Sequence, residues 1–271
     1  MARYEKRRIQ MIQRLERVNV LYLNDMANHF NVSKETIRQD FDALSELETI
    51  ERIHGGIRWV KKTMVNNHYI FEDEKMKHIE SKKAIAYKAL SWIEDGSTIF
   101  LDTGSTVACL FQYLNFKKKL IVITASIPLL FSYLEPETKQ MFQRCAHQFI
   151  FVGGHVNCDL LGTYGPFFDQ MVGSINIDVL FFSGDAFDLE KGLSNTDEVA
   201  FSLIQTLKEK SLRLVALVDH SKVGKLTTFQ CLTTKSIDVL ITDYEFSSED
   251  KGRLEISNVV LNDIKTSLNQ F

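Results

Sequence analysis

The best candidate for ligand chemistry is a short polar run that follows the apolar residues 98–101: Asp102-Thr103-Gly104-Ser105-Thr106. In such a run a glycine lets the backbone approach a ligand, hydroxyls form hydrogen bonds, and the first amides of a following helix are unpaired. Gly104, Ser105 and Thr106 therefore have the chemistry to hold a phosphate group. The same residues also fit an ordinary helix cap, so the run alone leaves both interpretations open.

Small, hydroxyl-bearing or charged residues follow four other apolar runs in the same part of the chain: Thr124-Ala125-Ser126, Gly153-Gly154, Ser183-Gly184-Asp185 and Asp219-His220-Ser221-Lys222. If the apolar runs are parallel strands, these residues lie at the strand ends where α/β proteins bind ligands. His220 could also serve acid–base chemistry. No nucleophile, base and orienting group accompany it in a recognisable set, so a hydrogen-bonded structural histidine is the favoured interpretation.

A different chemistry is indicated near the N-terminus, where polar side chains lie on short amphipathic helices. Apolar residues recur at helical spacing in residues 3–17, 23–30 and 33–47, and Ser33 can cap the third helix. Two helices joined by a short turn, the second with a polar face at its start, are typical of a helix-turn-helix motif. The first helix is expected to turn five basic residues towards solvent: Lys6, Arg7, Arg8, Arg14 and Arg17.

Residues 49–60 (TIERIHGGIRWV) contain two β-prone runs around a pair of glycines. Glycine adopts positive φ readily, so a hairpin fits this stretch. A hairpin that follows three helices makes a winged helix. Arg52, His54 and Arg58 would then lie within reach of DNA phosphates.

The rest of the chain alternates short apolar runs with helical patterns. The expected strands are residues 98–101, 120–124, 149–152, 179–183, 214–218 and 239–242. The expected helices are residues 76–93, 106–114, 127–134, 168–172 and 196–210. Because several of the runs are apolar on both faces, the alternation predicts an α/β domain with a mostly parallel sheet.

Length and composition narrow the class of protein. A chain of 271 residues favours two domains, and 45% hydrophobic with 25% charged residues is typical of a folded protein. The longest apolar runs fall short of the roughly 20 residues of a membrane span, and the basic N-terminus lacks the apolar segment of an export signal. No CxxC pair occurs, so free thiols are expected and neither a zinc site nor another cofactor is: Cys109, Cys145, Cys158 and Cys231.

Charge is divided unevenly along the chain. Residues 1–62 contain 12 Lys and Arg against 9 Asp and Glu, whereas the remainder contains 20 against 26. A small basic head therefore precedes a larger acidic body. The net charge of −3 does not exclude nucleic-acid binding by the head.

Residues 33–41 (SKETIRQDF), Leu44 and residues 52–56 (RIHGG) together resemble the N-terminal signature of the DeoR family of bacterial transcriptional regulators. That pattern has a Thr-Ile-Arg-basic-Asp core and a His-Gly-Gly wing. Gln39 stands where the family usually has a second basic residue, and Glu48 where a glycine usually ends the recognition helix. The resemblance implies that the third helix enters the major groove of DNA. The implied DNA-contact residues are Ser33, Lys34, Thr36, Arg38 and Gln39, with Arg52 and His54 on the wing.

The larger part of the chain resembles the sensor domain of the same family. The matching pieces are residues 102–106, Gly153-Gly154, Gly165-Pro166, Asp178, Gly192-Leu193-Ser194, Asp219 and Ser221-Lys222. Ala125 departs from a common Asn, and His220 from a common Ser. The resemblance implies a fold like ribose-5-phosphate isomerase and a phosphorylated sugar as effector. It implies that Gly104, Ser105, Thr106 and Lys222 hold phosphate, while Asp102, Thr124 and Asp185 face sugar hydroxyls.

We therefore expect a cytoplasmic, DNA-binding repressor of a sugar-metabolism operon that is not an enzyme. Its expected partners are operator DNA, a phosphorylated sugar and further copies of itself in a dimer or tetramer, with no membrane. The expected domains are a winged helix-turn-helix at residues 1–60, a connector at 61–75, and an α/β effector-sensing and oligomerisation domain at 76–271. A sugar-phosphate isomerase-like enzyme with an accessory DNA-binding head, and an architectural DNA binder without effector, are the alternatives.

Overall fold

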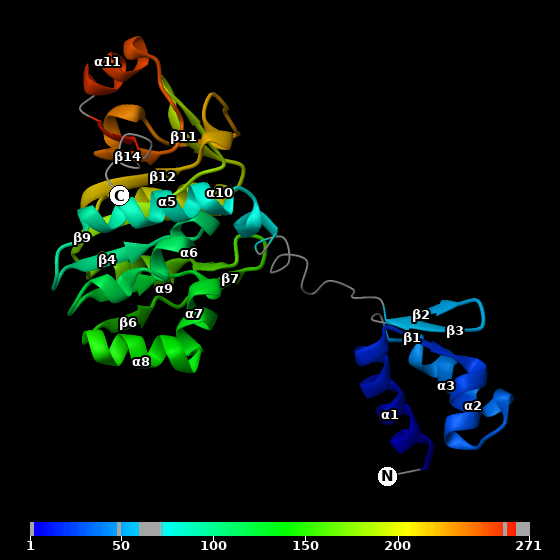
Figure 1. Cartoon of the computed structure of the whole chain (residues 1–271). Coiled ribbons are helices and arrows are strands. Elements are labelled where there is room, and N and C mark those ends of the chain that lie inside the picture. The colour runs from blue at the N-terminus through cyan, green and yellow to red at the C-terminus, as the bar shows by residue number, and fades with distance from the viewer. Residues whose placement is uncertain (1–2, 48–49, 60–70, 72, 257–258, 264–271) are drawn as a thin grey trace. The chain divides into compact units, whose positions relative to one another are not determined.

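A computed structural model describes residues 3–47, 50–59, 71, 73–256 and 259–263 of the chain. Two units are separated along the sequence, Met1–Asn66 and Asn67–Phe271 (Figure 1). Of the expected connector, residues 61–70 and 72 lie outside the described residues, as does Glu48. Residues 73–76 at its end are already helical. We call the first unit the head and the second the sensor.

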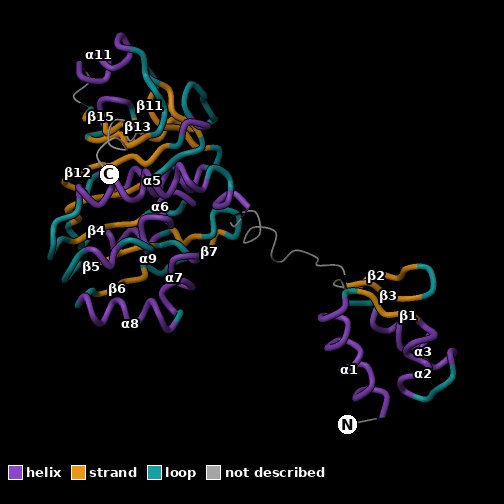
Figure 2. The backbone as a smooth tube through the Cα atoms, viewed as in Figure 1, coloured by secondary structure: helices purple, strands orange, loops and turns teal. Residues whose placement is uncertain are grey.

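The head consists of three helices and a three-stranded antiparallel sheet with the strand order β1-β3-β2 (Figure 2). Its elements in chain order are α1 (Arg3–Val18), β1 (Val20–Tyr22), α2 (Leu23–Phe30), α3 (Lys34–Leu44), β2 (Ile50–Ile53) and β3 (Gly56–Trp59). The apolar stripe of each helix packs into one core, to which Met11, Leu15, Ile37 and Phe41 each contribute a fully buried side chain. This arrangement confirms the predicted winged helix-turn-helix fold.

One sequence-based expectation about α1 is wrong. Arg7 and Arg8 do not extend into solvent, because their guanidinium groups donate to Asp40 of α3 at 2.5 and 2.8 Å. The Asp40 side chain is 2% exposed, and those of Arg7 and Arg8 are 14% and 32% exposed. Removing a carboxylate from water is costly unless cations and hydrogen bonds compensate it, so the two arginines are held inward.

The hairpin between β2 and β3 needs glycine at its turn. Gly55 has a φ of 76°, which a residue with a Cβ adopts only with strain. A Cβ on Gly56 would lie 2.3 Å from the carbonyl oxygen of Leu21, because β3 pairs closely with β1 at this point. The paired glycines therefore set both the turn and its packing.

The sensor is built around seven strands with the order β15-β14-β12-β9-β4-β5-β6, all of them parallel. Their bounds are β4 (Thr98–Leu101), β5 (Ile121–Thr124), β6 (Gln148–Phe151), β9 (Ile177–Phe182), β12 (Ser211–Val218), β14 (Val239–Thr242) and β15 (Val260–Asp263). The six expected strands are confirmed, and β15 extends the sheet at one edge. The mixed α/β class with a large parallel sheet is therefore as predicted.

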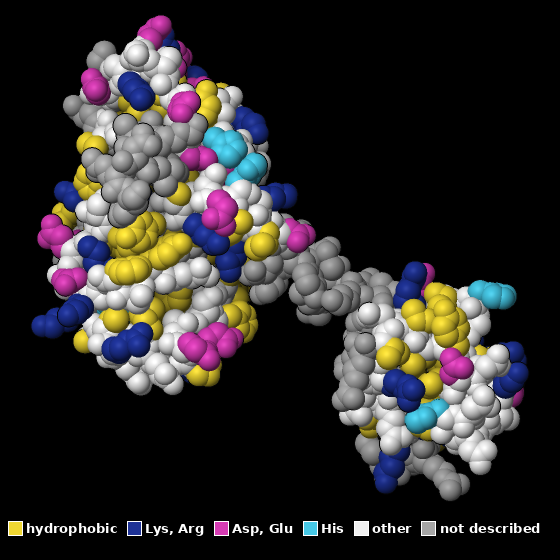
Figure 3. All heavy atoms as spheres, viewed as in Figure 1, with side chains coloured by type: hydrophobic (Ala, Val, Ile, Leu, Met, Phe, Trp, Pro, Cys, Tyr) yellow, Lys and Arg dark blue, Asp and Glu magenta, His cyan; other side chains and the backbone are white. Residues whose placement is uncertain are grey.

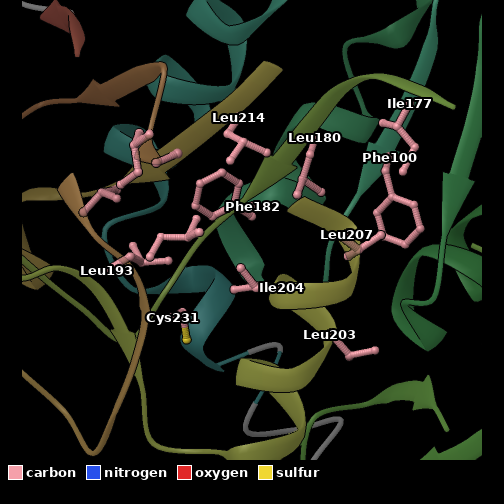
Figure 4. Packing of buried hydrophobic residues seen from close by; sticks show 14 of the residues in the cluster. Phe100, Ile177, Leu180, Phe182, Leu193, Leu203, Ile204, Leu207, Leu214 and Cys231 are labelled. Atoms are coloured by element: carbon pink, nitrogen blue, oxygen red, sulfur yellow. The ribbon is translucent and has the colours of Figure 1, made fainter. Parts of the chain in front are cut away.

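Helices cover both faces of this sheet. They are α5 (Ile79–Ala89), α6 (Ser105–Phe111), α7 (Ile127–Leu134), α8 (Pro136–Cys145), α9 (Pro166–Gly173), α10 (Glu198–Lys208) and α11 (Ser248–Ile256), with 3-10 turns at Leu90–Trp92, Leu114–Phe116, His220–Lys222 and Thr234–Ser236. Successive strand residues point to opposite faces, so Leu101 and Phe181 pack with α5 and α6, whereas Leu180 and Phe182 face α10 (Figure 4). Two cores result, one on each face.

Two smaller antiparallel sheets lie beyond the main strands and were not expected from the sequence. One is the hairpin β7 (His155–Asn157) and β8 (Gly162–Tyr164). The other joins β10 (Ala186–Asp188), β11 (Gly192–Asn195) and β13 (Phe229–Leu232). Both bring chain segments to the carboxyl ends of the parallel strands, where the polar runs also lie.

Candidate functional site

The head presents a polar surface at the start of α3. Ser33 precedes the helix and accepts a hydrogen bond from the amide of Thr36 at 3.1 Å, while the two hydroxyl oxygens lie 2.8 Å apart. Lys34, Arg38 and Gln39 follow on the exposed face, whereas Ile37 on the opposite face is fully buried. The first two turns of α3 therefore offer polar side chains to a partner while the helix stays anchored in the core.

Ion pairs hold the basic residues of this surface in place. Arg38 donates to Glu35 at 2.7 Å, and Arg52 of the wing donates to Asp42 at 2.9 Å while lying over the ring of Phe41. His54 at the wing turn is exposed. On the side drawn in Figure 3, basic and acidic side chains of the described residues are interspersed on the head, and no patch of a single charge covers this side.

The sensor contains a cavity of about 240 Å³ at the carboxyl ends of its central strands. Three parallel strands end there, and the residues that directly follow β4, β9 and β12 line the cavity: Asp102, Ser183 and Asp219. The lining is completed by other segments, and its members are Phe71, Glu74, Asp102, Thr103, Gly104, Ser105, Thr106, Asp159, Leu160, Leu161, Ser183, Gly184, Asp185, Asn195, Asp197, Ala200, Asp219 and Lys222. The topology of the sheet thus brings residues more than 100 positions apart to one place.

Six of the seven residues named from the sequence line this cavity: Asp102, Gly104, Ser105, Thr106, Asp185 and Lys222. The structure does not place Thr124 there. Thr124 is fully buried, its hydroxyl donates to the carbonyl of Leu101 at 2.6 Å, and the same oxygen accepts the amide of Ser126 at 3.0 Å. Its hydrogen-bonding capacity therefore serves the backbone of β4 and β5, and we leave it out of the site.

Gly104 permits the sharp turn between β4 and α6. Its φ is 140° and its ψ is 145°, a conformation that side chains with a Cβ rarely adopt. The turn places the hydroxyl of Ser105 at the cavity, while Thr106 lines it from a buried position. Hydroxyl groups and glycine backbone therefore form one end of the cavity.

Asp102 gives the cavity an unusual carboxyl group. The side chain is almost wholly buried, and this burial raises the pKa of Asp102 to about 7, although hydrogen bonds from Thr103 oppose the shift. A carboxyl group with a pKa near neutrality can donate or accept a hydrogen bond according to its protonation. Strongly shifted carboxyls in clefts are typical of functional sites.

The other carboxylates of the cavity are partly engaged in local structure. Asp185 accepts from the amide and the hydroxyl of Thr196 at 2.9 and 2.6 Å through one oxygen. Asp197 caps α10 by accepting the amide of Ala200 at 2.9 Å, and Asp219 accepts from Ser221. Each carboxylate has about four acceptor positions, so these groups retain capacity for ligand hydroxyls.

Lys82 is a functional candidate that sequence reasoning missed. It lies on α5, it is 2% exposed, and its ammonium donates to the carbonyl of Glu74 and to the hydroxyl of Ser105, the latter at 2.9 Å. Burial lowers the pKa of Lys82, while the charges of Asp219 and Glu74 oppose that shift. The available signal was a lysine at the helical spacing of Ile79, Ile85 and Ala86, where an apolar residue is usual.

His220 has a structural partner outside the cavity. Its Nδ1 lies 2.6 Å from Asp243 Oδ2, its amide donates to the other oxygen of Asp243 at 2.7 Å, and its ring meets that of His78 edge to face. Hydrogen bonding to His220 and to Ser81 lowers the pKa of Asp243, against the opposing effect of its burial. This geometry agrees with the favoured interpretation of a hydrogen-bonded histidine.

In the described part of the chain, no helix combines the length and apolarity needed to cross a membrane. Within the same residues, no group of three or more His, Cys, Asp or Glu side chains is arranged to hold a metal ion.

Comparison with known proteins gives matches over both units. Residues 7–63 match the DeoR-like helix-turn-helix domain, and residues 77–244 match the DeoR C terminal sensor domain. The HTH-type transcriptional regulator GolR of Listeria innocua is 30% identical over 238 residues, which are 88% of this chain and 90% of the relative. The lactose phosphotransferase system repressor of Staphylococcus aureus is 27% identical over 223 residues, which are 82% of this chain and 85% of that protein.

Solved structures resemble the sensor more weakly. Ribose 5-phosphate isomerase A from Neisseria gonorrhoeae is 14% identical, covers 52% of each chain and has a TM-score of 0.34. A likeness of this extent carries no argument about activity. The relatives that match along most of the chain are transcriptional regulators, and this protein is likewise a regulator that is not an enzyme. Its helix-turn-helix and sensor domains, in that order, make it a member of the DeoR family of transcriptional regulators.

Proposed function

We propose that the protein represses a sugar-metabolism operon and that a phosphorylated sugar, bound in the sensor cavity, regulates it. The observation that carries this proposal is the composition of the cavity, whose lining combines Lys222, the hydroxyls of Ser105 and Thr106, and several carboxylates, with the buried ammonium of Lys82 bonded to Ser105. The similarity to a lactose phosphotransferase system repressor supports the sugar pathway but does not identify the sugar.

The polar groups of the cavity suit the two parts of such a ligand. Lys222, Ser105 and Thr106 all line the cavity, and the ammonium of Lys82 donates to the hydroxyl of Ser105. A phosphate group is stabilised by ammonium groups and hydroxyl donors of this kind. Asp102 and Asp185 supply acceptors for the hydroxyl groups of a sugar. A ligand with one anionic end and several hydroxyls fits this distribution better than a purely apolar one.

For the head, we propose that α3 enters the major groove of operator DNA. Ser33, Lys34, Thr36, Arg38 and Gln39 would contact bases or phosphates, and Arg52 and His54 would add contacts from the wing. One short helix reads only a few base pairs, so usable specificity requires a dimer or tetramer on repeated half-sites. A protein that binds operator DNA in a bacterium works in the cytoplasm, so we propose that location for this protein.

Regulation requires that the effector bind two arrangements of the protein with different affinities. The test uses DNA selected by the wild-type protein from a random-sequence pool, and gel shifts with a panel of pentose and hexose monophosphates. We expect one of them to change the DNA affinity of the wild type by roughly tenfold, within the usual range of allosteric coupling. Lys222→Ala should keep its DNA affinity and lose the response.

Lys225→Ala is the matched control, since Lys225 is an exposed lysine three residues away that does not line the cavity. It should respond as the wild type does. A Lys222→Ala protein that responds normally would remove Lys222 from the effector site. If no member of the panel shifts either DNA affinity or thermal stability, the architectural DNA binder becomes the better description.

A further inference from the structure

Phe71 and residues 73–77, which together we call the entry segment, contribute to the cavity wall. They are the first part of the sensor that the structure describes, and they precede α5. Phe71 and Glu74 line the cavity, and the amide of Lys77 donates to the carbonyl of Asp73 at 3.0 Å in a helical turn. The segment that leads along the sequence from the head to the sheet is therefore also a wall of the candidate effector site.

A buried ammonium ties this segment to the candidate phosphate site. Lys82 donates both to the backbone carbonyl of Glu74 and to the hydroxyl of Ser105, and only 2% of its surface is exposed. A buried charge of this kind is stable only where its donors are used. A ligand that binds Ser105 therefore acts on the same ammonium that holds the entry segment.

The carboxylate of Glu74 supplies negative charge at this place. It forms an ion pair with Lys77. That hydrogen bond lowers the pKa of Glu74, and the charges of Lys222 and Lys82 lower it further. Glu74 and Lys222 both line the cavity, so an anion that enters it meets the repulsion of the Glu74 carboxylate.

Free volume lies on the other side of the entry segment as well. A second cavity of about 200 Å³ is lined by Phe71 and Lys75 of the segment, by Gln112 after α6 and by Phe131 of α7. Phe71 thus borders both cavities. A displaced segment therefore has free volume to move into, but it must break the hydrogen bond from Lys82 to Glu74 and the packing of Phe71 against the core.

We propose that Glu74 competes with the anionic group of the effector for Lys222 and Lys82, so that ligand binding displaces the entry segment from the cavity wall. This inference rests on the proposed function, because it takes the cavity as an anion site. The displaced segment is continuous with the chain that leads to the head.

The experiment measures binding of inorganic phosphate to the full chain by calorimetry. Glu74→Gln should bind phosphate roughly tenfold more tightly than the wild type, since it removes a like charge from the site. Glu80→Gln is the matched control, because Glu80 pairs with Lys83 at 3.0 Å in the same i,i+3 arrangement but is exposed and does not line the cavity. It should bind as the wild type does.

The second measurement is amide hydrogen exchange of residues 73–77 with phosphate or chloride at equal ionic strength. Phosphate should speed exchange in the wild type and leave it unchanged in Lys222→Ala. Equal phosphate affinity of Glu74→Gln and Glu80→Gln, with binding still dependent on Lys222, would overturn the role of Glu74 and leave the proposed anion site intact. If phosphate leaves the amide exchange of residues 73–77 in the wild type unchanged, the proposed displacement of the entry segment is wrong. If wild type and variants all fail to bind phosphate, the proposed anion site falls, and this inference with it.

Discussion

Two buried aspartates, one in the head and one in the sensor, differ in whether cations compensate their negative charge. Asp40 in the head is 1% exposed and Asp102 in the sensor is 6% exposed. Asp40 receives a guanidinium from Arg7 and another from Arg8, which join α1 to α3. Asp102 receives hydrogen bonds from Thr103, and burial raises its pKa to about 7.

The difference separates a structural carboxylate from one available for binding. The Asp40 carboxylate is already used by two cations, so it has little to offer a ligand and much to contribute to the packing of the head. The Asp102 carboxyl is buried at some cost and faces a cavity. Proteins retain such an unfavourable free energy of burial at functional sites, where a bound ligand can supply the hydrogen-bond partner that the carboxyl lacks.

The largest expected effect is on the pH dependence of the free energy of unfolding, which measures the cost of burying the Asp102 carboxyl. Below a pH of about 3, Asp102 is protonated in both the folded and the unfolded chain. As the pH rises towards 7, the unfolded chain loses this proton while the folded chain keeps it, so the folded state is progressively penalised. Asp102→Asn removes the penalty. Its stability relative to the wild type should therefore increase with pH, by up to roughly 3 kcal/mol between pH 5 and pH 8.

Urea unfolding followed by the fluorescence of Trp92 measures this effect. Trp92 lies in the sensor, and a Trp59→Phe background removes the tryptophan of the head. An advantage of Asp102→Asn that is equal at both pH values would show that ionisation of this carboxyl does not destabilise the sensor.

The corresponding change in the head should act in the opposite direction. Asp40→Ala leaves two guanidinium groups without their carboxylate, and we expect a loss of about 3 kcal/mol in the stability of the head. Amide exchange in α1 and α3 of the full chain should become roughly a hundredfold faster. Asp42→Ala is the control, because the ion pair of Asp42 with Arg52 is exposed and contributes about 0–1 kcal/mol. Equal amide exchange in the two variants would show that the buried ion pairs of Asp40 contribute no more to the stability of the head than the exposed pair of Asp42.

The fold of the head could be predicted almost completely, because the patterns that define it lie within one short stretch. Ser33 as a cap, the polar face of α3 and the Gly55-Gly56 turn are all local patterns. The exception was the position of Arg7 and Arg8, whose partner Asp40 is more than 30 residues away. A helical period shows which side chains could face solvent, but it does not reveal a distant buried carboxylate.

In the sensor, the sequence predicts the parallel strands and the cavity residues that directly follow them, but not the cavity residues supplied by other segments. Runs that are apolar on both faces identified β4, β5, β9, β12 and β14, and strand ends identified Asp102, Asp185 and Lys222. Glu74 was assigned to the connector and Lys82 to an ordinary helix, since only the fold brings them to Ser105. Thr124 was misplaced because a hydroxyl at a strand end can bond to the neighbouring strand instead of a ligand.

A third prediction concerns the exposed charges of the head. Arg38→Ala should weaken binding to selected operator DNA by roughly tenfold to a hundredfold, the usual value of one good base contact, while the fold stays intact. The control is Arg253→Ala in α11, since Arg253 pairs with Glu249 at 2.9 Å and has a side-chain exposure of 52% against 53% for Arg38. An unchanged gel-shift affinity of Arg38→Ala would remove this residue from the DNA interface.

The smallest effect separates the two roles of Ser33. Ser33→Ala removes the cap of α3 and should cost about 1 kcal/mol of stability in the head. Ser33→Asp keeps a good capping group but brings a negative charge to the surface that we propose faces phosphates. If α3 binds DNA as proposed, Ser33→Asp retains the thermal stability of the wild type and loses operator affinity, and added salt reduces the difference. If Ser33→Asp instead retains both the stability and the operator affinity of the wild type, while Ser33→Ala loses only stability, Ser33 acts as a cap alone and the DNA contact begins farther along the helix, because a carboxylate introduced near phosphates weakens binding.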